Sequence, residues 1–482
     1  MKYARFLALS PLVFMAGLAW AEPASLTLND YLNQVRSDNP AFRASLETQR
    51  GFPLQSWESH LVYSPNLYAD INYLDDRKEG ASAMQAERTR SADWNVELSN
   101  LFPSGTKLSA SYGVDYMHQY MPASSSLPPS IVNGLFASLP YYDAAPSISI
   151  SQSLCRDFMG ISTRAGVSRD DVIAKASELS ERYRSKQMEF QAEQTYWNLA
   201  YARIAVDFSR SLLGQARKLS EWTEKKAVLH LIEEIDLLQI RANLKVRENN
   251  LRIAEQNLLS VARNFNALRN TGGEVVDEEL EDIKGRATLT AGFSLTKGGD
   301  RLDVQTSRLF LKAAELNAKM ALNRALPAVN AFGTLTLNGH AGTSRDAGEA
   351  SLEGEHPTYL VGVTVSAPLG VKALKSTIDG YGMANRAAKH NLEQAIKDAE
   401  KDWGEAVQNW SDTKASLVLA MEIEDIQGQK YLKGMDGFHD GKTSMFQLLS
   451  FSEDYLQAQL NSLQLARTLL ILDAQARLYN AR

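Results

Sequence analysis

The sequence predicts an α+β membrane protein that combines long helices with amphipathic strands. Three observations support this fold class: an export signal at the N-terminus, two long windows without proline, and short segments that alternate apolar and polar residues. The same order of elements also occurs twice along the chain, which indicates an internal duplication.

Residues 1–21 have the features of a secretory signal peptide. Basic residues precede an apolar run from Phe6 to Leu18, and Ala19-Trp20-Ala21 forms a small-x-small cleavage site. This run is shorter than the ~20 apolar residues of a spanning helix, and no later segment approaches that length. We therefore expect the mature chain to begin near Glu22 and to carry no helical membrane anchor.

Composition and charge exclude several classes of protein. With 44% hydrophobic and 22% charged residues, the 482-residue chain is expected to fold. A net charge of -6 gives no basic footprint for nucleic acid. The single cysteine, Cys155, cannot form an internal disulfide and lies far from the cleavage site. The chain has no phosphate-binding glycine loop and no convergent nucleophile, base or metal set, so we expect neither an enzyme nor a cofactor.

Proline placement marks the long helices, because proline costs ~3 kcal/mol inside a helix. None of the 14 prolines falls between Pro146 and Pro327, and none follows Pro368. Both windows are rich in Ala, Leu, Glu, Gln, Lys and Arg. Each window therefore predicts long helices.

Apolar residues at helical spacing run from Asp170 to Phe265. A break near residues 226–231 would fold this segment into an antiparallel hairpin. The second window repeats the design, with residues 383–434 as the descending helix and 443–479 as the returning one.

Between the helices, six segments alternate with period two, which is typical of strands. They are residues 67–73, 94–99, 108–116, 146–152, 329–338 and 361–366. Soluble half-buried sheets also alternate in this way. The export signal and six aromatic residues favour a membrane sheet with an interfacial girdle. These aromatics are Trp94, Tyr112, Tyr116, Tyr120, Tyr141 and Tyr142.

The duplication divides the mature chain into two repeats, each with a helix, strands and a helical hairpin. Asn39-Pro40-Ala41-Phe42 aligns with Arg301-Leu302-Asp303-Val304, and in each repeat a proline leads into the strands. We place the first repeat at residues 22–270 and the second at 301–482. The segment 271–300 joins them and holds the acidic run 277–282, which we interpret as a solvated loop of an equatorial belt.

Two segments carry a family resemblance. The first is Leu26-Thr27-Leu28-Asn29-Asp30-Tyr31-Leu32 with Asn39-Pro40, and the second is Leu448-Leu449 followed by Tyr455-Leu456-Gln457-Ala458-Gln459-Leu460. With these motifs the mature chain resembles the TolC-like outer membrane efflux protein family, or outer membrane factors. The first segment is similar to the first helix of that family, and the second is similar to its final returning helix.

The resemblance implies a homotrimer in the outer membrane, with a transmembrane β-barrel in lipid that continues into a long α-helical barrel in the periplasm. It implies an exit duct of a tripartite efflux or type I secretion system. The duct would passively conduct substrate from an inner-membrane pump of the RND, ABC or MFS type, through a periplasmic membrane-fusion adaptor. Family members usually contribute four strands per chain to a twelve-stranded barrel. With six candidate strands per chain, the number of strands in the barrel stays open between twelve and eighteen. Two of the six strands would otherwise form a hairpin outside the barrel wall.

The resemblance also implies two sets of site residues at the helix turns. The periplasmic tip that contacts the adaptor comprises Leu229, His230, Leu231, Asp440, Gly441 and Lys442. The entrance constriction, or gate, comprises Asp236, Phe438, Thr443, Gln447 and Ser450. Gly441 fits the glycine that the family has at its turns, whereas His230 departs from it and has the plain alternative of an exposed turn residue.

Gln447 and Ser450 are neutral where the family often has an Asp-x-x-Asp pair. Because acidic rings favour cations, we expect an entrance that is less cation-selective than in acidic relatives. Asp236 with Glu233 and Glu234 either forms an acidic tip or is a solvated helix start that the helix dipole favours.

The main alternative is a secreted periplasmic coiled-coil scaffold without channel activity, whose strands form a soluble sheet. No His-Glu-x-x-His or comparable spacing occurs, so we expect no metal site.

Overall fold

The computed structural model describes residues 25–79, 86–120, 139–228, 233–440 and 442–479. The predicted signal peptide, residues 1–21, lies outside this part. The chain divides into two compact units: unit 1 holds residues 1–45, 184–299 and 401–482, and unit 2 holds residues 46–183 and 300–400. Each unit takes segments from both predicted repeats, and the repeat boundaries stay a prediction.

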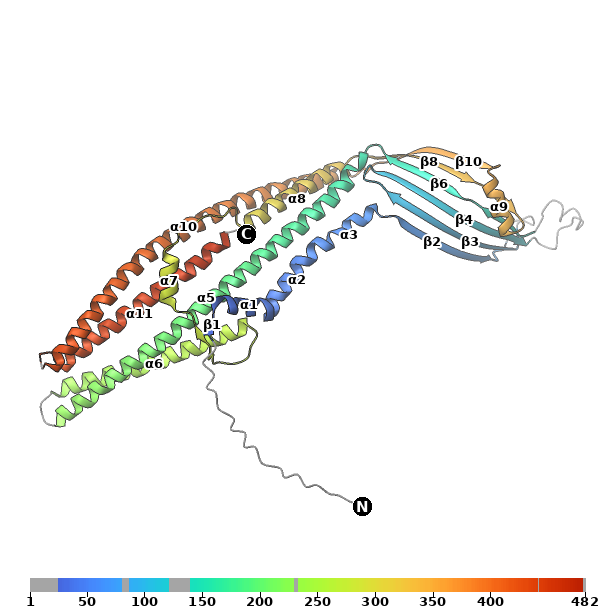
Figure 1. The fold of residues 1–482 in the computed structure, drawn as a ribbon. Helices are drawn as coiled ribbons and strands as arrows, with labels where there is room; N and C mark the ends of the chain where they lie inside the picture. Colours follow the sequence, from blue (N-terminus) through green and yellow to red (C-terminus); the bar gives the residue numbers. More distant parts are fainter. Residues whose placement is uncertain (1–24, 80–85, 121–138, 229–232, 441, 480–482) are drawn as a thin grey trace, which may run out of the picture. The chain divides into compact units, whose positions relative to one another are not determined.

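Unit 1 is built around two antiparallel helix pairs (Figure 1). Its elements are β1 (Ser25–Leu26), α1 (Leu28–Asp38), the later part of α5 (Ile161–Val228), α6 (Glu234–Leu268), β7 (Glu279–Leu280), α7 (Ile283–Ala291), the later part of α10 (Val371–His439), α11 (Met445–Ala476) and η3 (Arg477–Tyr479). The helix α5 has 68 residues, which at 1.5 Å per residue makes it about 100 Å long. No helix in the described part of the chain is long and apolar enough to cross a membrane.

The helix boundaries follow the proline pattern, although α5 begins at Ile161 and not at the predicted Asp170. α5 ends at Val228, inside the predicted break. α10 begins at Val371 and ends at His439, so it is longer at both ends than the predicted 383–434. The early start of α10 is explained by proline placement, since Pro368 is the last proline of the sequence and no later proline interrupts the helix.

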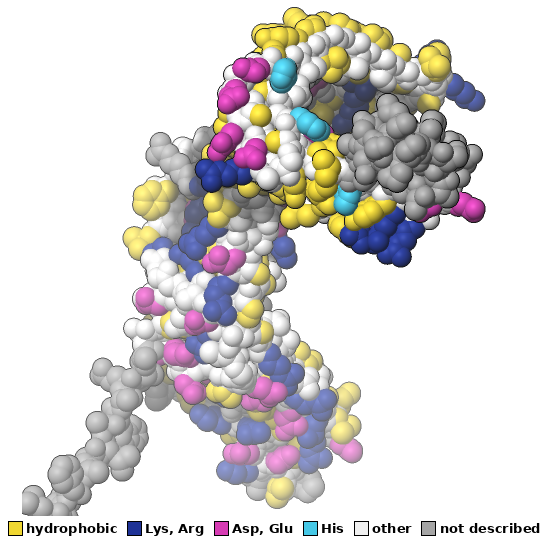
Figure 2. Space-filling model, turned by 90° about the vertical axis from the view of Figure 1, so that its right-hand side faces the viewer, with side chains coloured by type: hydrophobic (Ala, Val, Ile, Leu, Met, Phe, Trp, Pro, Cys, Tyr) yellow, Lys and Arg dark blue, Asp and Glu magenta, His cyan; other side chains and the backbone are white. Residues whose placement is uncertain are grey.

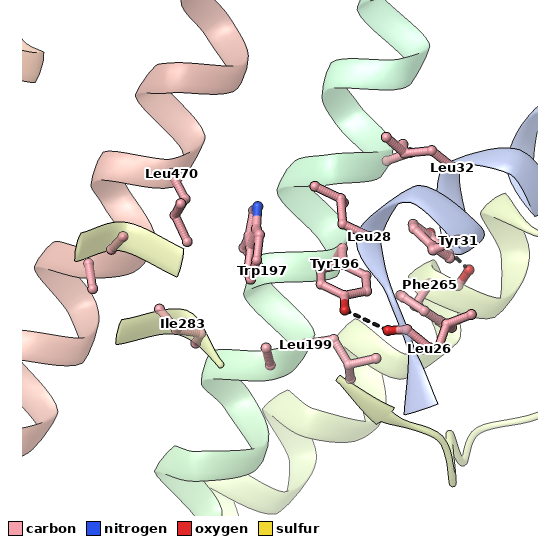
Figure 3. Packing of buried hydrophobic residues seen from close by; sticks show 14 of the residues in the cluster. Leu26, Leu28, Tyr31, Leu32, Tyr196, Trp197, Leu199, Phe265, Ile283 and Leu470 are labelled. Carbon is pink, nitrogen blue, oxygen red and sulfur yellow. Dashed lines mark hydrogen bonds between the residues drawn. The ribbon is translucent and has the colours of Figure 1, made fainter. Parts of the chain in front are cut away.

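An aromatic cluster forms the core of unit 1 (Figure 3). The rings of Tyr31 and Phe265 stack with centroids 4.0 Å apart, and Tyr196 meets Trp197 edge to face at 5.0 Å. The Tyr196 hydroxyl donates to the carbonyl of Leu26 at 2.7 Å. Each such aromatic pair adds ~1 kcal/mol beyond its buried area. The cluster therefore holds α1, α5 and α6 together.

A buried ion pair joins α5 to the end of the chain. Arg477 donates from Nη2 to Oε1 of Glu193 at 2.6 Å, and the Glu193 side chain is only 7% exposed. Burial raises the pKa of Glu193, and the Arg477 guanidinium opposes that rise. The pair thus links the first helix pair to the residues that follow α11.

The acidic run 277–282 is only partly a solvated loop: Asp277, Glu279 and Asp282 are exposed, whereas Glu278 and Glu281 are half-buried. Glu279 and Leu280 form a short parallel ladder with Ser25 and Leu26. The Glu281 side chain accepts from the Leu28 amide at 2.8 Å, and Asp282 caps α7. Two of its carboxylates, those of Glu281 and Asp282, therefore satisfy backbone groups, which charge patterning alone does not reveal.

Unit 2 contains an antiparallel sheet, with helical segments before, between and after its strands in the sequence. Its elements are the later part of α2 (Pro40–Gln55), α3 (Trp57–His60), η1 (Leu61–Tyr63), β2 (Asn66–Asp76), β3 (Arg88–Leu101), β4 (Thr106–Tyr120), β5 (Tyr141–Ala144), β6 (Ser147–Ser153), η2 (Phe158–Gly160), the first part of α5, α8 (Leu302–Arg324), β8 (Ala328–Leu337), β9 (Gly339–Ala341), α9 (Ser344–Glu353), β10 (Pro357–Ser366) and the first part of α10.

Six of these strands form a continuous path in the order β10-β8-β6-β4-β3-β2, while β5 pairs with β4 and β9. All six predicted strand segments fall within or largely overlap this path. The sequence did not predict β5, β9 and α9, because these elements are short and lack a sustained period.

The sheet has one apolar and one polar face. Leu67, Leu98, Ala110, Ile148, Leu335 and Tyr359 are paired in turn from β2 to β10 and so share one face. Ile71 is 84% exposed and Val361 85%. The neighbouring row, on the other face, includes Glu97, Ser111, Ser147 and Thr336. Figure 2 shows hydrophobic side chains gathered along the strand-bearing part.

Candidate functional site

The turn of the second repeat is closed by backbone hydrogen bonds to Gly437. The amides of Lys442 and Thr443 donate to its carbonyl at 2.7 and 3.0 Å. Asp440 and Lys442 form an exposed ion pair of 2.9 Å. Gly441, the third residue of this predicted tip, lies outside the described residues. The described part of this tip thus presents one charge of each sign.

Gln447 is part of a helix cap. The Ser444 hydroxyl accepts from the Gln447 amide at 3.2 Å, and Oε1 of Gln447 accepts from the Ser444 amide at 3.1 Å. This reciprocal pair is a capping box at the start of α11. The pattern Ser-x-x-Gln in the sequence is typical of this box. The family resemblance concerned only the neutral charge of Gln447.

Close packing near the second turn explains three glycines of α10. A Cβ on Gly437 would lie 2.5 Å from Oγ1 of Thr443, and one on Gly434 would lie 2.6 Å from the ring of Phe451. A Cβ on Gly428 would lie 3.0 Å from the ring of Tyr455. Gly428 and Gly434 therefore let α10 pack closely against α11, and Gly437 leaves room for Thr443 in the turn.

The other predicted gate residues of the second repeat have different surroundings. Phe438 is half-buried in the last turn of α10. Thr443 is half-buried against Gly437. Ser450 is exposed in the second turn of α11. The structure therefore brings Thr443 into the turn, next to the charged residues Asp436, Asp440 and Lys442.

The first-repeat end is different in charge and capping. Leu229, His230 and Leu231 lie outside the described residues. Glu233 occupies the N-cap of α6 without a side-chain capping bond, and Glu234 and Asp236 lie in the first turn. Carboxylates at this position interact favourably with the helix dipole. The dipole accounts for these acids without excluding a role at an entrance.

Asp236 lines a pocket of about 330 Å³ at this end of unit 1. The pocket also contains Leu219, Trp222, Thr223, Gln239, Ile240 and Phe446. Phe446 comes from α11, whereas the other residues come from α5 and α6. The structure thus places Asp236, a predicted gate residue, beside Phe446 at the start of α11.

Contacts between the hairpins were not predicted. Gln215 on α5 donates to the hydroxyl of Ser452 on α11 at 2.6 Å, and Arg247 on α6 forms an ion pair with Glu453. Each pair joins residues more than 200 positions apart, so no local sequence signal identifies it. No group of His, Cys, Asp or Glu that could hold a metal ion occurs among the residues that the structure describes.

Solved structures of outer-membrane channels match nearly the whole chain. VceC from Vibrio cholerae is 14% identical, with a TM-score of 0.63 over 94% of this chain and 96% of that chain. The chain has the fold of TolC-type outer-membrane channels. CmeC from Campylobacter jejuni shares this fold at 13% identity, with a TM-score of 0.64 over 99% of this chain and 94% of that chain.

The open-state channel MtrE from Neisseria gonorrhoeae gives a third match at 14% identity, with a TM-score of 0.60 over 94% of this chain and 88% of that chain. No protein-family model and no curated protein matches the sequence. The resemblance to TolC-like proteins is therefore confirmed for the fold, while the roles of the tip and gate residues stay predictions.

Proposed function

We propose that this chain is one subunit of a homotrimeric outer-membrane exit duct, serving a tripartite efflux or type I secretion system. The observation that carries the proposal is the continuous apolar face of the six-stranded sheet, in a chain with the TolC-type fold. An antiparallel sheet with one apolar and one polar face is the form in which strands span a bilayer. The polar face would line the lumen.

In this proposal the helix turns of unit 1 face the partners. A periplasmic adaptor contacts the tip, and an inner-membrane pump supplies the substrate through it. The exposed Asp440–Lys442 pair offers such a partner a charge of each sign. The duct itself conducts passively and determines substrate choice less than the pump does.

Reconstitution of the full chain tests the proposal. We expect the purified protein to have the mass of three subunits, to migrate in a heat-modifiable manner, and to give stepwise conductance in planar bilayers. The scaffold alternative predicts a periplasmic protein that fractionates away from outer-membrane porins and gives no conductance. That scaffold would leave the apolar face of the sheet in water, which disfavours it because large exposed apolar patches are rare in soluble monomers.

Gln447 allows a specific test of the entrance. Gln447→Glu keeps the capping box, because Glu serves as well as Gln at this position, and it adds one carboxylate per subunit. If Gln447 lines the entrance, the reversal potential under a salt gradient shifts toward cation preference. Gln447→Ala is the matched control, since it removes the box without adding charge. An unchanged reversal potential in Gln447→Glu would place this residue away from the ion path.

A further inference from the structure

The sheet of unit 2 has an open edge at each end of its six-strand path. Among the described strands, β2 pairs with β3 alone and β10 pairs with β8 alone. In hydrocarbon, a backbone group without a hydrogen-bond partner is strongly destabilising, because no water is present to replace the partner. A sheet of this kind in a membrane must therefore be continued at both edges.

The two edges are complementary in direction. Every neighbouring pair along the path is antiparallel. Because the path contains an even number of strands, β2 and β10 run in opposite directions. The β10 edge of one copy can thus form the same antiparallel ladder with the β2 edge of another copy.

The apolar face reaches both edges. On β2, Leu67 is 68% and Tyr73 67% exposed; on β10, Tyr359 is 73% and Val363 62% exposed. These values are alike, so the edge strands carry the same apolar surface. A β2–β3 hairpin held outside the wall would leave its share of this surface in water.

The β3–β4 turn is fixed at the end of the sheet where β6 leads into α5. Gly105 and Gly160 both have left-handed backbone conformations, with φ of 75° and 69°. A Cβ on Gly105 would lie 2.8 Å from the amide nitrogen of Gly160. This interlocked pair holds the β3–β4 hairpin in line with the other strands.

The stagger of the strands fits a closed barrel. One row of directly paired residues runs through Asn66, Ser99, Ser109, Ser149, Thr334 and Leu360. It starts at the first residue of β2 and reaches β10 six residues before the last one, Ser366. One copy has six strand-to-strand steps when the step to the next copy is included, so six residues amount to a stagger of one residue per strand. With ~3.3 Å per residue and ~4.8 Å between strands, this stagger gives a tilt of about 35°. Closed barrels have tilts in this range.

We propose that three copies close one eighteen-stranded wall, in which β10 of each copy pairs with β2 of the next. The inference rests on the proposed homotrimer. At the tilt above, the backbone diameter would be about 33 Å, compared with about 22 Å for twelve strands. We place the first residue of β2, Asn66, opposite the last residue of β10, Ser366, in the neighbouring copy. In this register Ala69 of one copy pairs with Val363 of the other, and both side chains lie on the apolar face.

Disulfide cross-linking of the full chain in outer membranes tests the seam. Cys155→Ser removes the one cysteine of the sequence, and Ala69→Cys with Val363→Cys then places one thiol on each edge. Directly opposed residues of an antiparallel pair have Cβ atoms ~5 Å apart, close to what a disulfide needs. Mild oxidation should give reducible dimers and trimers. Each single-cysteine variant, and Asp70→Cys with Val363→Cys on opposite faces, should give none.

Two further results decide the proposal. Replacing Val363→Cys by Val361→Cys or Val365→Cys detects a seam shifted by two residues, which still supports an eighteen-stranded wall. If the β2–β3 hairpin lies outside a twelve-stranded wall, β10 must pair with β4. Cross-linking of Ala110→Cys to Val363→Cys would then appear instead and would overturn the inference.

Electron microscopy of the unsubstituted trimer gives the same decision without cysteines, as eighteen or twelve strands in cross-section. An unsubstituted protein that stays monomeric in membranes contradicts the proposed duct itself. A trimer with twelve wall strands contradicts only this inference.

Discussion

The two helical hairpins of unit 1 share a plan but differ near their turns. In the second hairpin, Gly428 and Gly434 allow α10 to pack against α11, Gly437 makes room for Thr443 in the turn, and a capping box starts the returning helix. In the first, Gly214 of α5 has open space around it, and α6 begins without a side-chain cap. The two hairpins therefore differ in packing and capping near their turns, while the Gln215–Ser452 and Arg247–Glu453 contacts join them.

The largest effect is expected where the first helix pair meets the residues after α11. Arg477→Ala leaves the buried Glu193 carboxylate without its partner, which should lower the free energy of unfolding by about 3 kcal/mol at neutral pH. Urea unfolding in detergent measures this change.

The pH dependence of that loss has a defined sign. Burial raises the folded-state pKa of Glu193 above its ordinary value of 4.5, so ionised Glu193 costs stability as the pH rises through that pKa. Arg477→Ala removes the group that opposes the rise. Its difference from wild type should be full at neutral and alkaline pH and shrink as the pH falls toward 4.5. The double variant with Glu193→Gln should show a flat difference; a pH-independent loss in Arg477→Ala alone would contradict the assignment.

Next in size is the contrast between the glycines. Gly434→Ala forces a methyl group against Phe451 and should cost about 2 kcal/mol through overpacking. Gly214→Ala meets nothing within 4 Å and should stabilise the exposed helix by up to ~1 kcal/mol. Opposite shifts of the unfolding midpoint would confirm the comparison, and shifts of equal sign would refute it.

Capping should give a smaller difference. Ser444→Ala removes the hydroxyl that accepts from the Gln447 amide, with an expected loss of about 1 kcal/mol. Glu233→Ala removes no capping bond and should change stability little, whereas Glu233→Ser supplies a cap and should stabilise α6. Thermal unfolding by circular dichroism tests all three, and an equal loss in Ser444→Ala and Glu233→Ala would show that the two helix starts do not differ.

The smallest effect is expected for exposed ion pairs, where the hairpins should behave alike. Lys430 and Asp454 lie 2.6 Å apart in the second hairpin, and Arg241 and Glu224 lie 3.4 Å apart in the first. Asp454→Asn and Glu224→Gln should each cost less than about 0.5 kcal/mol. Added salt should reduce both losses; a large, salt-resistant loss in one hairpin would add a further difference between them.

The sequence predicted those features that depend on local pattern. Proline-free windows located the long helices, and period-two alternation located all six strands of the path. The glycine contacts, the Glu193–Arg477 pair and the link from Arg247 to Glu453 depend on which helix faces meet, and no spacing along the chain encodes that. Gln447 is a third case. The Ser-x-x-Gln pattern predicts its role in the helix cap, but the prediction made for it concerned only its neutral charge at the entrance.

The unequal strand content of the two repeats affects how such a wall could change in evolution. The first predicted repeat holds β2, β3, β4 and β6, and the second predicted repeat holds β8 and β10. In an antiparallel sheet, the gain or loss of one hairpin changes the strand count by two and preserves the direction of both edge strands. A lineage could thus widen or narrow its pore in discrete steps while the subunits continue to assemble through the same pair of edges.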